Sequence, residues 1–162
     1  MFQANKSGAQ KKVDINLLNK NRYMKNEAVS KLMTTNIVVA HQFHNFSQVM
    51  RLFTEFPVHH LPVVDGQDRL VGIISSNDMV KAFKRMLIAG ETIQSLDQLD
   101  QQINLTEIMT PNPVTLAHSD PVGKAIELFA QKKFQALPVV EHGKVVGIVS
   151  IKDVVEFFHI RG

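Results

Sequence analysis

An internal repeat constrains this chain of 162 residues more than any other feature. Leu-Pro-Val-Val-Asp at 61–65 recurs as Leu-Pro-Val-Val-Glu at 137–141, an offset of 76 residues. Val-Gly-Ile-Ile-Ser at 71–75 recurs as Val-Gly-Ile-Val-Ser at 146–150, an offset of 75, and each copy has an Asp three residues after the Ser. Upstream, Leu-Met-Thr-Thr-Asn at 32–36 matches Ile-Met-Thr-Pro-Asn at 108–112. A fixed period of this kind indicates one supersecondary unit used twice.

Each copy, roughly 29–83 and 105–158, predicts the same order of strand, helix, strand, strand and helix. Short extended stretches come first, at Val38–Val39 and Val114–Leu116, and in the second copy Pro111 and Pro113 disfavour a helix. Apolar residues then recur at i, i+3, i+4 and i+7, which is typical of a helix: Phe46, Val49, Met50 and Phe53, then Val122, Ala125, Ile126 and Phe129. In the second copy, Asp120 is the expected N-cap of this helix, with Pro121 as its first residue.

The second half of each copy predicts a β-hairpin followed by a closing helix. Turn-forming residues at 65–68 and 141–144 separate two β-rich runs. The closing helices are expected to begin at Ser75 and Ser150. We expect them to bury Met79, Val80 and Phe83 in the first copy, and Val154, Val155 and Phe158 in the second.

The repeat divides the chain into four segments. Residues 1–26 form a basic leader that we expect to be flexible, and residues 27–83 form the first repeat. Residues 84–104 form a helical linker in which Ile93, Leu96 and Ile103 are expected to pack, and residues 105–162 form the second repeat. Because a unit of about 55 residues is marginally stable alone, the apolar sides of the two repeats are expected to cover each other.

Composition excludes several classes of protein. The chain has no Cys, so disulfides, thiolate nucleophiles and Cys-based zinc sites are impossible. Its apolar runs are of strand length, far below the ~20 residues of a membrane span, and its polar N-terminus lacks a secretory signal. Together these features predict a soluble cytoplasmic protein.

The positive net charge is concentrated in the leader. Residues 1–31 carry seven Lys or Arg against two acids, a net +5, which leaves −2 on the rest of the chain. A slightly acidic body is poor evidence for a nucleic-acid surface, although the leader could bind phosphate nonspecifically. Nucleic-acid binding through the leader is therefore kept only as a third hypothesis.

The motifs Met-Thr, Leu-Pro-Val-Val-acid and Val-Gly-Ile-x-Ser-x-x-Asp resemble those of the cystathionine beta-synthase (CBS) domain, and two in tandem resemble a Bateman module. The resemblance covers about residues 27–160. It implies an α/β fold of two pseudo-symmetric repeats packed through their sheets, and a regulatory homodimer. It also implies that adenosine-containing ligands bind in clefts between the repeats, with AMP, ADP and ATP ahead of S-adenosylmethionine and NAD.

The Ser-x-x-Asp segments, Ser75 with Asp78 and Ser150 with Asp153, allow two interpretations. Such a spacing before an apolar run is a common capping box, in which the Ser caps the helix and the acid lies near the positive end of its dipole. The resemblance implies that the same side chains bind ribose hydroxyls. Both roles are compatible.

The resemblance also assigns the remaining candidate residues. Residues at and before the Leu-Pro motifs would line base and phosphate: Val58, His59, His60, Leu61 and Pro62, then Phe134, Gln135, Ala136, Leu137 and Pro138. The backbone of Ile37 and Val38, or of Pro113 and Val114, would meet the adenine edge. Some relatives place a phosphate-facing Arg or His three residues before the Pro. Here those positions hold His59 and Gln135, so we expect weak neutralisation of phosphate. Because Phe134 and Ala136 make a different pocket from Val58 and His60, affinities are expected to differ between the copies.

Catalytic and metal chemistry have little support in the sequence. There is no P-loop, GxSxG, HExxH or dinucleotide fingerprint, and the seven His are scattered. We therefore expect no enzyme activity, no required cofactor and no metal. The leading hypothesis is a nucleotide sensor that acts on an unknown effector protein in trans, and the alternative is a structural dimerisation module with empty clefts.

Overall fold

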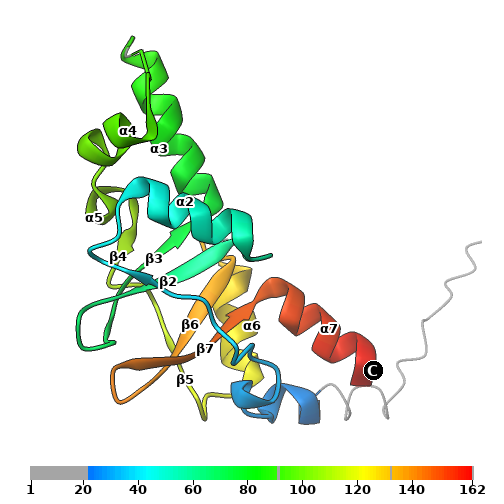
Figure 1. Ribbon diagram of the computed structural model, residues 1–162. Helices are drawn as coiled ribbons and strands as arrows, with labels where there is room; N and C mark the ends of the chain where they lie inside the picture. Colours follow the sequence, from blue (N-terminus) through cyan, green and yellow to red (C-terminus); the bar gives the residue numbers. More distant parts are fainter. Residues whose placement is uncertain (1–21, 91, 132, 162) are drawn as a thin grey trace, which may run out of the picture.

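The computed structural model describes residues 22–90, 92–131 and 133–161, so the expectations for leader residues 1–21 lie outside the described part. Each copy has the predicted order of elements (Figure 1). The first contains β1 (Ala40–His41), α2 (Phe46–Glu55), β2 (His60–Val64), β3 (Leu70–Ser75) and α3 (Ser76–Ile88). The second contains β5 (Leu116–Ala117), α6 (Val122–Ala130), β6 (Ala136–Glu141), β7 (Lys144–Ser150) and α7 (Ile151–Arg161). A short helix η1 (Val29–Lys31) precedes the first copy's strands, and α4 (Leu96–Gln102) lies in the linker between the copies. Helix α5 (Leu105–Ile108) and strand β4 (Thr110–Pro111) begin the second copy.

The two sheets exchange strands between the copies. Their orders are β1-β2-β3-β4 and β5-β6-β7. Strand β4 belongs to the second copy, yet it pairs with β3 of the first, where Thr110 lies opposite Ile73. Reciprocally, Thr34 of the first copy pairs with Ile148 of β7 through two backbone hydrogen bonds of 2.9 and 3.0 Å. Each copy thus completes the sheet of the other.

Two glycines make this exchange possible. A Cβ atom on Gly72 would lie 2.5 Å from Sδ of Met109, which comes from the start of the second copy. A Cβ on Gly147 would lie 2.6 Å from Sδ of Met33 and 3.1 Å from the backbone oxygen of Thr34. The exchanged segments therefore pack directly on the backbone of the two strands.

Buried strand residues form the core of each copy. In the first, Leu61, Val63 and Ile74 pack with residues of α2 and α3. In the second, the corresponding residues are Leu137, Val139 and Val149. Pro62 lies within β2, which is compatible with pairing because the neighbouring strand β1 begins only opposite Val63.

Capping side chains start most of these helices. Ser75 caps α3 as predicted, and Asn45 with Gln48 forms a capping box on α2. The expectation for α6 was wrong: Pro121 is its N-cap, with an extended ψ of 146°, and the helix begins at Val122. Asp120 instead accepts hydrogen bonds from the Ala117 N–H (2.7 Å) and from Lys124. Its carboxylate is therefore occupied by these partners and does not cap the helix.

The linker packs only in part as expected. Gly90, at φ 79°, follows the end of α3, and α4 then lies against α2. Asp100 on α4 holds this contact, because its carboxylate accepts bonds of 2.7 Å from both N–H and Oγ of Ser47. Ile103 is buried and Ile93 is half-buried, but Leu96 is exposed, contrary to expectation.

The exposed faces of the closing helices also differ from expectation. Met79 is buried and Val154 and Phe158 are half-buried, but Val80, Phe83 and Val155 are exposed. The face of α3 that packs on the core is instead formed by Met79, Ala82 and Met86. The helical period was correct, but the sequence did not identify which apolar face meets the sheet.

The residues preceding η1 join the second copy. Residues 22–26 are helical, and Met24 is buried in a cluster with Val122 and Phe157. Residues 22–26, which were expected to belong to the flexible leader, therefore pack against the second copy. Among the described residues, no helix is long and apolar enough to cross a membrane.

Candidate functional site

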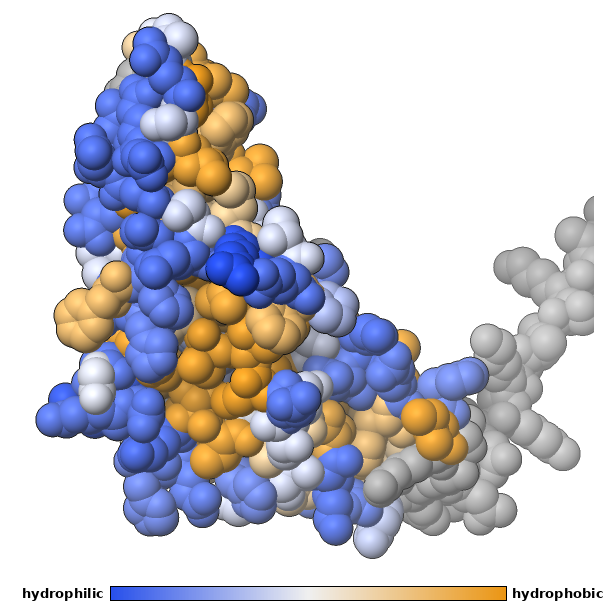
Figure 2. Space-filling model, in the orientation of Figure 1, coloured by the Kyte–Doolittle hydropathy of each residue, from blue (hydrophilic) through white to orange (hydrophobic). Residues whose placement is uncertain are grey.

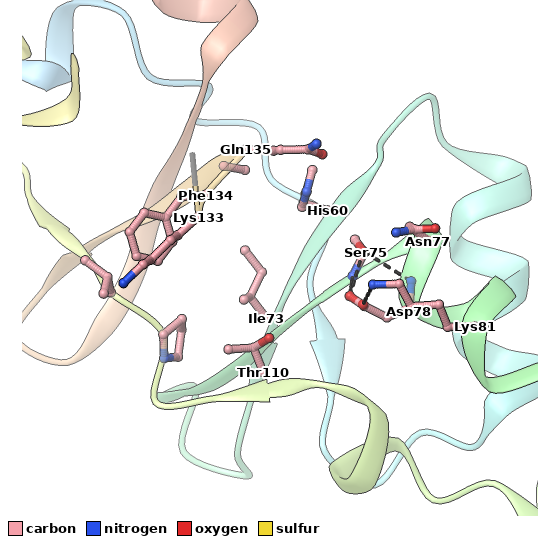
Figure 3. A pocket seen from close by; sticks show the side chains of 13 residues that line it. His60, Ile73, Ser75, Asn77, Asp78, Lys81, Thr110, Lys133, Phe134 and Gln135 are labelled. Carbon is pink, nitrogen blue, oxygen red and sulfur yellow. Dashed lines mark hydrogen bonds and ion pairs between the residues drawn. The ribbon is translucent and has the colours of Figure 1, made fainter. Parts of the chain in front are cut away.

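A cavity of about 310 Å³ lies between the two copies (Figure 3). The first copy contributes one wall, formed by His60, Ile73, Ser75, Asn77, Asp78 and Lys81. The second contributes the other, formed by Thr110, Pro113, Val114, Lys133, Phe134, Gln135 and Ala136. The exchange of β4 brings these walls together, because Thr110 pairs with Ile73 beside Ser75.

Ser75 and Asp78 form a capping box on the first wall. Asp78 Oδ2 accepts hydrogen bonds from Ser75 N–H (2.9 Å) and Oγ (2.6 Å), and Ser75 Oγ accepts one from Asp78 N–H (3.3 Å). The other oxygen, Oδ1, lies 3.7 Å from Lys81 Nζ. Capping therefore occupies Oδ2, and both side chains remain only half-buried at the cavity.

The structure brings together candidate residues that the sequence assigned to different copies. His60, Ser75 and Asp78 share this cavity with Pro113, Val114, Phe134, Gln135 and Ala136. Leu61, Pro62, Leu137 and Pro138 do not line it, because they are buried in the central strands. Their contribution to the site is to position the residues that precede them.

The remaining candidates lie outside this cavity: Ile37, Val38, Val58, His59, Ser150 and Asp153. Ser150 and Asp153 nevertheless repeat the geometry of the first pair. Asp153 Oδ2 accepts bonds of 2.6 Å from both N–H and Oγ of Ser150. The helix starts also match, because Ile151 N–H bonds to the Gln135 oxygen just as Ser76 N–H bonds to that of His59.

Five residues of the cavity were missed by sequence reasoning: Ile73, Asn77, Lys81, Thr110 and Lys133. One signal could have found Lys81, which lies one helical turn after Asp78 on the same face. Thr110 could not be assigned without the strand exchange, whereas Lys133 directly precedes the predicted residue Phe134. Phosphate neutralisation was therefore judged only from His59 and Gln135, whereas two lysines line this cavity.

His60 contributes a neutral group to the cavity. Burial lowers the pKa of its imidazole, and the nearby His59 lowers it further, while Asp78 acts in the opposite direction. The ring is therefore uncharged near neutral pH and offers hydrogen bonds rather than positive charge. In the described part of the chain, no three acidic or His side chains gather in a way that could hold a metal ion.

Comparison with known proteins identifies the repeated unit. The CBS domain model matches residues 29–85 and 105–160. Homoserine O-acetyltransferase of Methanohalobium evestigatum is 29% identical over 135 residues, which cover 83% of this chain and 24% of that protein. Inosine-5'-monophosphate dehydrogenase of Mycobacterium leprae is 31% identical over 126 residues, covering 76% of this chain and 21% of the enzyme. The chain thus spans about a quarter of the length of these curated relatives.

Solved structures agree in fold over most of the chain. The CBS domain pair of protein MJ0100, in complex with 5'-methylthioadenosine and S-adenosylmethionine, has a TM-score of 0.69 and 26% identity; the match covers 83% of this chain and 98% of that one. CBSX2 from Arabidopsis thaliana, in complex with AMP, has a TM-score of 0.68 and 26% identity, with 84% and 99% covered.

Proposed function

Because the chain belongs to the CBS domain family and carries two of these domains, we propose that it is a regulatory module that binds an adenosine-containing nucleotide between them. One observation carries this proposal: a half-buried carboxylate and hydroxyl, Asp78 and Ser75, line a cavity built from both repeats. A ligand that contacts both walls would bind one packing of the repeats more tightly than another, and a partner protein would detect the difference.

The chemistry of the walls suits an adenosine. Asp78 can accept hydrogen bonds from two adjacent ribose hydroxyls, and such charge-assisted bonds are stronger than neutral ones. On the other wall, Phe134 and Val114 offer apolar surface to a base, and the backbone around Pro113 offers polar groups to its edge. The volume of about 310 Å³ lies within the range of small-molecule sites. The AMP bound by CBSX2, and the 5'-methylthioadenosine and S-adenosylmethionine bound by MJ0100, support an adenosine-containing ligand.

A second cleft is proposed from the repeat. Its candidate residues are the repeat counterparts of those in the first cavity: Ile37, Val38, Val58, His59, His60, Ser150 and Asp153. Ser150 and Asp153 hold the same capping geometry as Ser75 and Asp78, which leaves the Asp153 carboxylate available to a second sugar. The role remains regulatory rather than catalytic, and no cofactor is required.

A thermal-shift screen tests the proposal. AMP, ADP, ATP, S-adenosylmethionine and NAD are each added at about 1 mM, where a ligand present at 100 times its Kd adds about 2.7 kcal/mol to stability. For a chain of this size that corresponds to a rise in Tm of about 5–10 °C. A rise with at least one adenosine compound is expected. Flat curves for all five would contradict nucleotide binding and favour the dimerisation module with empty clefts.

The exposed apolar residues on α3 and α7 are proposed to bind a second copy of the chain. Val80 is 62% exposed and Val155, its counterpart in the other repeat, is 61% exposed. The two helices diverge as separate arms (Figure 1), and apolar surface runs along the α3 arm towards the centre of the molecule (Figure 2). Beside α3, an apolar hollow of about 390 Å³ between α2, α3 and α4 can receive a partner side chain. Because both repeats present an exposed valine at the same position of the closing helix, a twofold dimer would cover both at once.

Sedimentation velocity measures this association. The wild-type chain is expected to be a dimer at micromolar concentrations. The double variant Val80→Asp, Val155→Asp is expected to weaken dimerisation by at least about tenfold, because it places unpaired carboxylates in the interface. Phe43→Asp is the matched control, because Phe43 is 76% exposed and lies outside this face. A monomeric wild type, or equal effects of the control and the double variant, would contradict the assignment.

A further inference from the structure

Two lysines from different repeats stand at the rim of the cavity. Lys81 lies on α3, with Nζ 3.7 Å from Asp78 Oδ1 and a side chain that is 65% exposed. Lys133 precedes β6 and lines the same cavity. In Figure 3, Lys133 and Phe134 lie on one side of the cavity, and Ser75, Asp78 and Lys81 on the other. An anion bound in the cavity between these two walls would therefore have a lysine on either side.

The second repeat provides an internal comparison for these charges. By the offset of 75, Ser75 and Asp78 correspond to Ser150 and Asp153, so the proposed sugar-binding pair is unchanged. The position of Lys81, however, is taken by Glu156, whose carboxylate lies 3.4 Å from Lys152 Nζ. By the offset of 76, the position of Lys133 is taken by Pro57.

The charged side chains that accompany the two Ser-Asp pairs therefore differ in net sign. Two lysines accompany one carboxylate beside Ser75, whereas one lysine accompanies two carboxylates beside Ser150. A carboxylate at the position of Glu156 repels phosphate, and a lysine in the same place attracts it. The difference concerns the part of a nucleotide beyond the sugar, because the sugar-binding pairs are the same.

We propose that the cleft at Ser75 and Asp78 selects phosphorylated adenosine ligands, with Lys81 and Lys133 holding the phosphates, and that the cleft at Ser150 and Asp153 lacks this selectivity. The inference rests on the proposed nucleotide binding and specifies which adenosine ligands the first cleft takes. Adenosine itself fits either cleft, but only the first gains affinity from a phosphate.

The surface next to the cavity carries further cations that a longer phosphate chain can reach. A hollow of about 490 Å³ shares Asp78 and Lys81 with the cavity and continues along α3, where Lys84 and Arg85 line it. Glu107 lies on its other side, so the cations are concentrated on the α3 wall. A chain of two or three phosphates that leaves the cavity past Lys81 meets these further cations. The first cleft is therefore expected to bind ATP more tightly than AMP, and AMP more tightly than adenosine.

Isothermal titration of the full chain with adenosine and with ATP, in magnesium-free buffer, tests the selectivity. Wild type is expected to bind ATP at least about tenfold more tightly than adenosine, a difference that raised salt reduces. Lys81→Glu, which copies the residue of the second repeat, is expected to weaken ATP binding by about tenfold or more and to change adenosine binding by less than about twofold. Lys133→Ala should act in the same direction with a smaller effect.

Lys144→Glu is the matched control for a charge reversal. Lys144 lies on the hairpin of the second repeat, contacts Asp68 at 3.5 Å and does not line the cavity, so its replacement should leave both affinities unchanged. Equal affinity of wild type for ATP and adenosine would overturn the phosphate selectivity while leaving adenosine binding intact. Equal losses of ATP and adenosine binding in Lys81→Glu would also overturn it. Failure of both ligands to bind wild type would overturn the proposed function as well.

Discussion

Asp78→Ala is expected to abolish nucleotide binding at the cavity between the repeats while leaving the fold intact. Capping occupies Oδ2 of Asp78, and the proposed ribose contacts involve the remaining acceptor capacity of the carboxylate. Hydrogen bonds to a charged group contribute about 1.5–3 kcal/mol each, so the loss of two should weaken binding by at least about 100-fold. Isothermal titration with AMP measures the loss.

Asp153→Ala is a matched control for the structural part of this effect. Asp153 accepts the same two bonds from Ser150 that Asp78 accepts from Ser75, so both variants remove an equivalent capping box. Each should lower the stability of the chain by about 1 kcal/mol. AMP affinity at the first cleft should survive in Asp153→Ala. If the two variants lose AMP binding equally, the affinity does not arise from the cavity at Asp78.

The candidate site shows what a single sequence with a repeat can predict. The recurrence of Ser-x-x-Asp identified both capping boxes, because the spacing alone determines which backbone N–H the Ser can reach. Grouping the residues into clefts was less successful. Ser75 shares its cavity with Phe134 of the other repeat, because Thr110 crosses over to pair with Ile73 beside it. Spacing along the chain contains no record of that exchange, so Thr110 was missed.

The errors in the fold have a related cause. Helical spacing predicted the closing helices, but α3 has two apolar faces, one of them formed by Met79 and Met86 and the other by Val80 and Phe83. Periodicity does not reveal which face the sheet covers. In the same way, Asp120 followed by Pro121 is a common helix start, yet the nearby Ala117 N–H and Lys124 compete for the Asp120 carboxylate and leave Pro121 as the N-cap.

Gly147→Val is expected to destabilise the chain by about 3 kcal/mol or more, because overpacking at a contact that cannot relax costs this much. Valine favours strands, so the cost would not come from β propensity. It would come from Met33 and from the backbone oxygen of Thr34, which lies only 3.1 Å from a Cβ atom at this position. Met33 can change its rotamer, but Thr34 is fixed by its two hydrogen bonds to Ile148. Urea denaturation followed by circular dichroism gives the change in the free energy of unfolding.

Two further glycine variants separate this steric effect from the general cost of replacing glycine. Gly66→Ala should be nearly neutral, because its nearest neighbour, Phe43, is 3.9 Å away in ordinary contact. The loss of stability in Gly72→Val should lie between those of Gly66→Ala and Gly147→Val. The added side chain meets only the Met109 side chain, which can move, and no backbone atom. An unfolding free energy of Gly147→Val close to that of wild type would mean that Thr34 leaves β7 easily. The two repeats would then depend on the exchange far less than their paired backbones indicate, and a ligand could separate them at little cost.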